Sequence, residues 1–373
     1  MKLSAEISRR EFLRCSALSA AAMGTAAALD YQTAMGKSPT NKKTKIRIGV
    51  RFNEHWLKSK NDEDLQFFKQ IGVDYADIAL NLVEGYEEHG VFAKADLKAF
   101  VDRLAIVGLK IERANSLGSY YLNAHLHGPE RQEEINKLRR IGEMVTDFEI
   151  PVFGIQACQA AMHIDNRRAG WVLQQRRGGY EYYNFNIARS IAGSPKPRYK
   201  VTADQLWKGL LNIYQQVMPT VEGSKTKIAM HGNDPPLYQY LGNPQIICRF
   251  ADFDRLFREV PSEHNGITFC CGTRYELGED VLKGIRHFGK QGKLFHVHFR
   301  NVRGTLPRDK GYSEVFVDDG DMNMAHVVRA LNDVDYDGVI DFDHPMYVTG
   351  DKPLPKQYIA FAVGYIRGLL QSL

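Results

Sequence analysis

Four residues of metal-ligating type stand in the C-terminal half of the chain, each at the end of a separate apolar segment. They are His231, Cys270, His298 and Asp343. Two imidazoles, a thiolate and a carboxylate form a ligand set that suits one divalent transition metal. A lone histidine or cysteine in such a place is more often an ordinary buried residue. Four of them at consecutive segment ends predict a shared metal site.

Polar residues alternate with apolar ones in two of these segments. Side chains two apart in a strand point to the same face, so His296 shares a face with His298, and Asp341 shares one with Asp343. In a closed barrel the apolar face packs on helices and the polar face lines the interior. We expect His296 and Asp341 to lie one layer below the ligands and to orient them.

Further polar residues are placed to act beside this site. Arg300 follows the second histidine by two residues and should face the same side, where a guanidinium can clamp the carboxylate of a substrate. His344 directly follows Asp343, which places it beside the cation. Asp165 and Arg168 belong to a long polar segment, and we expect them to reach a bound substrate once that segment closes.

These residues need a scaffold that brings distant segments together. We predict strands at 46–52, 73–80, 109–114, 151–157, 226–231, 266–270, 293–299 and 337–343. Helical patterns lie at 62–71, 94–107, 129–147, 203–218, 250–258, 278–289, 322–333 and 354–371. Eight alternating units indicate an α/β fold, a closed (β/α)8 TIM barrel. An open doubly wound sheet is the alternative, although no Gly-rich nucleotide loop follows the first strand.

One connection in this barrel is unusually long. Residues 158–202 are polar and rich in Arg, Gly, Tyr and Asn. A loop of this length inside a compact domain is typical of a lid or a binding loop. In a barrel it would lie on the C-terminal face, where active sites are found. We therefore treat 46–373 as a single catalytic domain that carries a long loop at 158–202.

The N-terminus has the features of an export signal. Ser8-Arg9-Arg10-Glu11-Phe12-Leu13 precedes an Ala-rich stretch from Cys15 to Leu29. Paired arginines, a short apolar core and small residues near its end predict a twin-arginine signal peptide over 1–30 and a linker over 31–45. The apolar stretch is too short for a membrane span. We expect a periplasmic or exported protein without stable membrane insertion once the signal is removed.

The charge distribution argues against nucleic acid as a partner. The net charge is +5, but residues 1–45 hold eight Lys/Arg and three acidic residues, so the rest of the chain carries equal numbers of both. No basic surface for phosphates is implied.

The five cysteines, Cys15, Cys158, Cys248, Cys270 and Cys271, are irregularly spaced. They do not form the pattern of a disulfide framework.

The motifs around these residues resemble those of the mannonate dehydratase family. The resemblance covers roughly residues 46–370 and is densest after residue 226. The matching runs are His231-Gly232-Asn233-Asp234-Pro235-Pro236, the segment from Asn265 to Thr273 with Cys270-Cys271-Gly272-Thr273, His298-Phe299-Arg300-Asn301-Val302, Gly320-Asp321-Met322-Asn323-Met324, Asp343-His344, and Tyr358. Gly232 stands where the family usually has Pro, and Cys271 where it often has Thr.

The resemblance implies a xylose-isomerase-like barrel and the dehydration of D-mannonate, or a related sugar acid, to 2-keto-3-deoxy-D-gluconate. It implies that Mn2+ is bound by His231, Cys270, His298 and Asp343, and that His344 and Tyr358 move protons. Cysteine ligation also suits Fe2+, Co2+ and Zn2+. The expected partner is a small-molecule sugar acid, and homo-oligomer formation stays open.

Two other functions fit parts of the pattern. A metal-dependent sugar isomerase or epimerase on the same barrel usually employs several Asp/Glu ligands, often around two metals, whereas this set offers a single carboxylate. A catalytically inactive exported sugar-acid-binding protein would not need the two proton-transfer candidates, and both are present.

Overall fold

The computed structural model describes residues 44–52, 62–158, 169–192 and 200–373, and Thr44–Leu373 forms one compact unit. The predicted signal peptide and nearly all of the linker lie outside the described residues, as do Asp165 and Arg168. Among the described residues, no helix is both long enough and apolar enough to cross a membrane.

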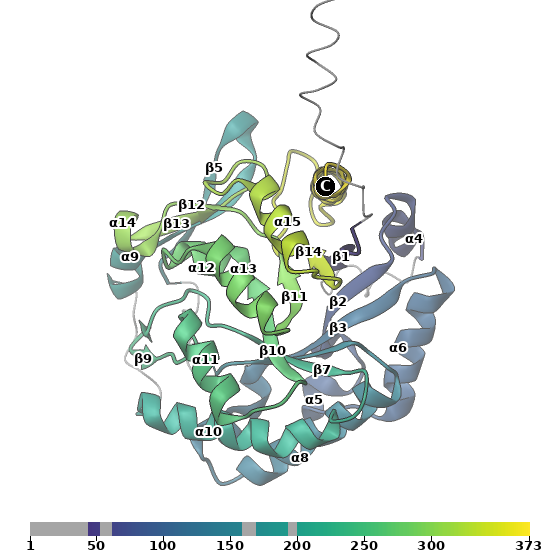
Figure 1. The fold of residues 1–373 in the computed structure, drawn as a ribbon, viewed down its shortest axis with the longest axis vertical. Coiled ribbons are helices and arrows are strands. Elements are labelled where there is room, and N and C mark those ends of the chain that lie inside the picture. The colour runs from purple at the N-terminus through teal and green to yellow at the C-terminus, as the bar shows by residue number, and fades with distance from the viewer. Residues whose placement is uncertain (1–43, 53–61, 159–168, 193–199) are drawn as a thin grey trace, which may run out of the picture. The chain divides into compact units, whose positions relative to one another are not determined.

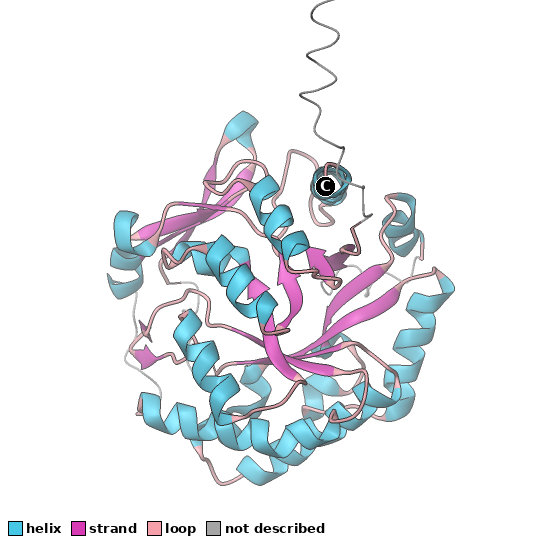
Figure 2. Ribbon diagram, in the orientation of Figure 1, coloured by secondary structure: helices cyan, strands magenta, loops and turns pink. Residues whose placement is uncertain are grey.

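Eight parallel strands close into a barrel, as predicted. Their order around the barrel is β1-β14-β11-β10-β7-β4-β3-β2, and helices surround them in Figures 1 and 2. The strands are β1 (Arg47–Arg51), β2 (Tyr75–Ala79), β3 (Lys110–Ser116), β4 (Val152–Gln156), β7 (Lys227–His231), β10 (Asn265–Cys270), β11 (Leu294–His298) and β14 (Val339–Asp341). The hydrophobic pattern therefore located all eight strands, and the open-sheet alternative is excluded.

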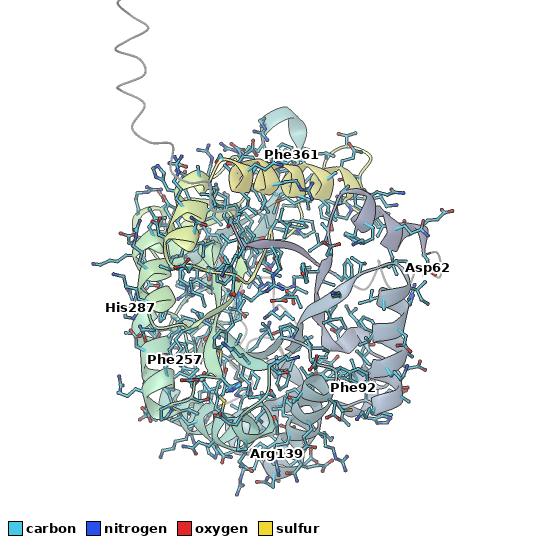
Figure 3. All side chains as sticks on the ribbon, turned by 45° about the vertical axis from the view of Figure 1, so that its right-hand side comes forward. Asp62, Phe92, Arg139, Phe257, His287 and Phe361 are labelled. Atoms are coloured by element: carbon cyan, nitrogen blue, oxygen red, sulfur yellow. The ribbon has the colours of Figure 1, made fainter. Side chains whose placement is uncertain are left out.

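The predicted helices form the outer layer. They are α4 (Glu63–Gln70), α6 (Lys94–Ile106), α8 (Arg131–Asp147), α10 (Ala203–Val217), α11 (Phe250–Glu259), α13 (Val281–Lys290), α15 (Met324–Asp333) and α16 (Lys356–Gln371). Figure 3 labels two exposed residues of this layer, His287 on α13 and Phe361 on α16. The chain adds short helices α5 (Tyr86–His89), α7 (Leu122–Leu126), α9 (Ile187–Ala192), α12 (Cys271–Glu276) and α14 (Leu306–Asp309).

Helix α10 shows why these segments are helical. Thr202 accepts a hydrogen bond from the backbone N–H of Gln205, and the Gln205 side chain accepts one from the N–H of Thr202. Such a capping box stabilises a helix by about 1 kcal/mol. Buried positions then follow the helical period at Leu206, Leu210, Ile213, Tyr214 and Val217. Burial of this face fixes the helix against its neighbours.

The interior of the barrel is polar and tightly paired. Arg113 on β3 donates to both carboxylate oxygens of Asp77 on β2, at 2.8 and 2.9 Å. The same guanidinium donates to Asn115 at 2.8 Å and across the barrel to Thr268 on β10 at 3.1 Å. Burying charges costs free energy unless they are paired and hydrogen-bonded, and here each is. This network supports the layer above it, at the carboxyl ends of the strands.

The described part of the long connection at 158–202 contains regular secondary structure. It contains strands β5 (Trp171–Gln175) and β6 (Glu181–Asn186), followed by α9. They join β12 (Val302–Arg303) and β13 (Gly311–Glu314) in an antiparallel sheet of order β12-β13-β6-β5. The prediction of a loop was therefore wrong for these residues, because the hairpin gains its pairing from a segment more than a hundred residues later. We call this the accessory sheet (Figures 1 and 2). A further two-stranded sheet is formed by β8 (Gln239–Tyr240) and β9 (Asn243–Pro244).

Candidate active site

Three of the four predicted metal ligands end neighbouring strands of the barrel. His231 is the last residue of β7, Cys270 of β10 and His298 of β11. One ligand atom from each lies within 4.8 Å of the others, and all three residues are buried. Because parallel strands end at the same rim of a barrel, residues separated by dozens of positions in sequence meet here.

The two histidines have ring nitrogens that are free of hydrogen bonds and could bind a metal. His231 Nδ1 lies 2.7 Å from the carbonyl oxygen of Gly232, which orients the ring, and Nε2 is buried without a hydrogen-bond partner. Both ring nitrogens of His298 are likewise buried without a hydrogen bond, and carboxylate oxygens of Asp343 and Asp77 lie 3.5 and 3.6 Å from them. Burial lowers the pKa of each imidazole, so both are neutral near pH 7. Neutral rings with unpartnered nitrogens are what a transition metal requires, and a hydrogen bond on the other nitrogen of His231 fixes its tautomer.

Cys270 stands at the start of α12. Its Sγ accepts a hydrogen bond from the backbone N–H of Thr273 at 3.4 Å, and Arg300 Nη2 lies 3.5 Å away. Burial raises the pKa of the thiol to about 11, although Arg300 opposes this. A thiol must lose its proton to bind a metal. The donors from Thr273 and Arg300 are placed to stabilise the thiolate that metal binding would create.

Asp343, the fourth predicted ligand, lies beside His298 and is not one of the residues whose ligand atoms converge within 4.8 Å, and its backbone geometry differs from the one predicted. Strand β14 ends at Asp341, and Asp343 has a φ of +63° in the left-handed region. Its N–H donates to the Asp341 carboxylate at 2.8 Å, and its Oδ1 lies 3.5 Å from His298 Nδ1. Arg51, at the end of β1, pairs with the same oxygen at 2.5 Å. The alternation argument therefore stops at Asp341, and a turn rather than the strand directs Asp343.

The layer beneath these residues is built as an ordered support. His296 Nε2 lies 2.9 Å from the Asp341 carboxylate, and both side chains are fully buried. Asp77 lies 3.6 Å from His298 Nε2. Burial acts to raise the pKa of Asp77, but the Arg113 guanidinium, together with the imidazoles of His298 and His296 and with Arg51, outweighs it and holds that pKa well below its usual range. Asp77 therefore stays ionised beneath the upper site.

Arg300 forms ion pairs with the carboxylates that surround the predicted metal ligands. Four protein carboxylates surround its buried guanidinium, at 2.6–3.3 Å: Asp234, Glu276, Glu314 and Asp343. Three of these, Asp234, Glu276 and Glu314, also lie close enough to each other to form a cation site. The guanidinium already occupies the position between them. The predicted clamp thus lies beside the metal ligands, and its contact with a substrate carboxylate stays a prediction.

His344 and Tyr358 both lie at this rim, in different surroundings. His344 Nδ1 lies 3.1 Å from Glu314 Oε2, and its Nε2 lies 3.6 Å from Asp343. Burial acts to lower the pKa of His344, but the two carboxylates outweigh it and raise that pKa. Tyr358 is buried at the start of α16, with its ring 4.7 Å from that of Phe316 and 5.4 Å from that of Phe342. Burial raises the pKa of its phenol strongly.

The accessory sheet presents one face to this rim. Trp171 pairs with Phe185, and Phe185 pairs with Tyr312 on β13. By the two-residue period of strands, Tyr183 and Glu314 share that face. A cavity of about 360 Å³ opens there, lined by Trp171, Tyr183, Glu314, His344, Pro345 and Tyr347. The sheet therefore supplies both the carboxylate partner of His344 and two aromatic side chains of a cavity that His344 also lines.

Sequence reasoning missed five charged residues of the site. Arg51, Asp77 and Arg113 lie on the first three strands, and Glu276 and Glu314 lie on α12 and β13. Asp77 and Arg113 each interrupt an apolar strand segment, and a charge in such a place was the available signal. Glu314 carried no comparable signal, because its strand is short and pairs only with the two-residue strand β12 and with the distant β6.

The closed parallel barrel with a buried His–Cys–His cluster at its rim defines a xylose-isomerase-like TIM barrel with a candidate metal centre. A solved mannonate dehydratase from Streptococcus suis serotype 2 superposes with a TM-score of 0.74 at 22% identity, over 88% of this chain and 94% of that one. A D-psicose 3-epimerase from Clostridium cellulolyticum H10 matches at 0.56 and 11% identity, over 87% of this chain and 99% of the other, which shows the shared fold alone.

Sequence comparison is more specific. A family model described as D-mannonate dehydratase (UxuA) matches residues 196–373. Mannonate dehydratase 2 of Halalkalibacterium halodurans is 30% identical over 356 residues, which cover 87% of this chain and 99% of that protein. A mannonate dehydratase of Thermotoga maritima is 31% identical over 285 residues, 74% of each chain. The chain belongs to the mannonate dehydratase family, a family of hydro-lyases.

Proposed function

We propose that this protein dehydrates D-mannonate to 2-keto-3-deoxy-D-gluconate with one Mn2+ ion held by His231, Cys270, His298 and Asp343. The observation that carries the proposal is the convergence of ligand atoms from three strand ends within 4.8 Å, in a chain of this family. The buried, unpartnered nitrogens of His231 and His298 fit such an ion. Fe2+, Co2+ and Zn2+ suit the same donors.

The reaction removes the proton at C2 and the hydroxyl at C3, and the resulting enol rearranges to the 2-keto acid. The C2 proton is weakly acidic because it lies beside a carboxylate, and hydroxide is a poor leaving group. A bound divalent ion supplies charge that offsets the negative charge developing next to the carboxylate. The protein must then accept one proton and donate another at fixed positions.

His344 and Tyr358 are our candidates for these two proton transfers. Burial keeps the Tyr358 phenol protonated, which suits donation to the departing C3 hydroxyl. His344 then takes the C2 proton, and Glu314 at Nδ1 stabilises the imidazolium that forms. We retain Arg300, Asp165 and Arg168 as candidates for substrate binding.

Metal-loaded protein incubated with D-mannonate should yield one 2-keto product per substrate consumed, and chelation should stop the reaction. A panel of aldonates and uronates run in parallel tests the choice of substrate. Tight binding without any product would instead indicate a binding protein. Interconversion of sugars at two metal equivalents per chain would indicate an isomerase. Against that alternative, the carboxylates Asp234, Glu276 and Glu314 already surround Arg300.

We also propose that residues 1–30 direct the protein through the twin-arginine route. The paired Arg9-Arg10 ahead of an Ala-rich stretch supports this. Replacement of both arginines by lysine should leave the full-length protein in the cytoplasm of a bacterial host, whereas the unaltered chain should be recovered from the periplasm. Equal distribution of the two proteins would refute export by this route.

A further inference from the structure

The cavity beside His344 differs in character from the site it adjoins. It is lined by His344 and Glu314, to which we assign the proton transfer, and by Trp171, Tyr183, Pro345 and Tyr347. None of the four metal-ligand candidates lines it. Because the cavity touches the proposed proton-transfer pair and none of the metal-ligand candidates, it is placed to receive a part of the substrate beyond C3.

The aromatic wall is held in place by packing. The Trp171 ring lies 5.1 Å from that of Phe185 and 5.5 Å from that of Tyr312, in tilted and edge-to-face arrangements. The segment that carries Tyr347 is tied to the same hairpin, because the N–H of Glu181 donates to the carbonyl of Tyr347 at 3.0 Å. The hairpin tip is held by ion pairs of Arg176 and Arg177 with two aspartates of the loop after β13. A preorganised wall binds a ligand at a lower entropic cost than a mobile one.

The side chains that line this cavity indicate the class of ligand that it would bind. The C4–C6 end of a free hexonate is a flexible polyol with a hydroxyl on every carbon, and it would require polar partners. A pyranose ring instead has an apolar face of C–H groups with its hydroxyls at the edge. Rigid aromatic rings complement such a face, and the few polar groups of an otherwise apolar pocket fix its orientation. Here those groups are Glu314 and His344.

We propose that this cavity is a subsite for a second sugar ring, and that the preferred substrates are mannonates glycosylated on the hydroxyl at C4, C5 or C6. This proposal rests on the proposed function for the position of the reacting carbons. Trp171 and Tyr183 are the residues that determine this specificity. A substituent at C4–C6 leaves the C2 proton and the C3 hydroxyl free, so elimination of water proceeds on the substituted acid with the same balance of atoms.

The test compares D-mannonate with mannobionate, which is β-1,4-mannobiose oxidised at its reducing end, on the Mn2+-loaded full chain. Affinity is measured as KM where a 2-keto product forms and by titration calorimetry where none forms. We expect mannobionate to bind tighter by about tenfold or more. Tyr183→Ala should remove this preference, and Trp171→Phe, which keeps an aromatic ring, should retain it.

Tyr182→Ala is the matched control, because Tyr182 neighbours Tyr183 on β6 but points to the opposite face of the sheet. It should leave the preference intact. Equal or weaker binding of mannobionate by the unaltered protein would overturn the subsite, as would equal effects of the Tyr182 and Tyr183 variants. Absence of product from both acids with the binding preference intact would refute the dehydratase proposal and still support the subsite.

Discussion

Glu314 and His344 form a hydrogen-bonded pair, 3.1 Å apart, that joins the accessory sheet to the loop after the last barrel strand. Glu314 is anchored from its other oxygen by Arg300 at 2.6 Å. A carboxylate held in this way sets the orientation of the imidazole and stabilises its charged form. The sheet is therefore a working part of the site, in addition to forming a wall of the cavity.

We predict that Glu314→Gln lowers kcat by about 10²-fold, within the range expected when general acid–base catalysis is impaired, and changes KM little. Glutamine retains the shape and one oxygen acceptor but loses the charge that stabilises the imidazolium. Steady-state kinetics on D-mannonate would measure the change. Glu181→Gln, on the neighbouring strand β6, is the control and should leave kcat unaltered. A rise in KM at constant kcat would show that Glu314 serves only to bind the substrate.

Removal of a metal ligand should abolish both metal retention and activity. His298→Ala or Cys270→Ala should lower metal affinity by more than the roughly 10- to 100-fold typical of residues that only orient a ligand. Metal content after gel filtration, measured by atomic emission, reports this loss independently of turnover. His264→Ala, at a half-buried histidine beside β10, is the control and should retain the ion. Full activity in either ligand variant would eliminate the proposed site.

The barrel could be predicted because each of its strands carries its own signal. Segments such as 226–231 and 293–299 are short, apolar and bounded by polar residues, so local pattern and global fold agree. The hairpin of β5 and β6 was missed although Gly178-Gly179 separates two runs with strand character, which is a hairpin signal. Its polar, exposed residues resembled a loop, and its pairing with β13 depends on contacts across more than a hundred positions.

The candidate site could be predicted where its residues fall at the ends of barrel strands. His231, Cys270 and His298 fall at strand ends, and strand ends can be located from the sequence. Glu314 and Arg51 reach the site only through tertiary structure, so residue type and spacing did not mark them. Asp343 was expected at the end of the last strand, but that strand ends at Asp341, and the left-handed backbone of Asp343 accompanies a hydrogen bond to Asp341 that the local sequence does not show.

Tyr358→Phe should keep the metal and lose turnover. The ring packs against Phe316 and Phe342, and phenylalanine preserves both contacts, so stability should change by less than about 1 kcal/mol. Loss of the hydroxyl removes the proposed proton donor and should lower kcat by about 10²-fold or more. Metal content and kcat are measured on the same sample. An unchanged rate would exclude Tyr358 from the proton transfers.

Glu112 links stability to pH. It lies on β3 with its carboxylate buried, 3.7 Å from Arg47, and its Oε2 has no hydrogen-bond partner. Burial raises its pKa from 4.5 to about 7, although His296 and Arg47 oppose the shift. A folded-state pKa above the unfolded value means that folding binds a proton between those two pH values. The free energy of unfolding should therefore fall as the pH rises from about 4.5 to 7. Above pH 7, Glu112 should cause no further decrease.

Glu112→Gln mimics the protonated carboxyl and should remove this dependence. Relative to the unaltered protein, the variant should gain on the order of 3 kcal/mol in unfolding free energy between pH 5 and pH 8, because each pKa unit corresponds to about 1.4 kcal/mol. Urea unfolding with chelator present measures this without a contribution from metal binding. Glu259→Gln, at an exposed ion pair with Arg255, should differ from the parent equally at both pH values. A difference for Glu112→Gln that stays constant with pH would mean that this carboxyl titrates alike in the folded and unfolded chains.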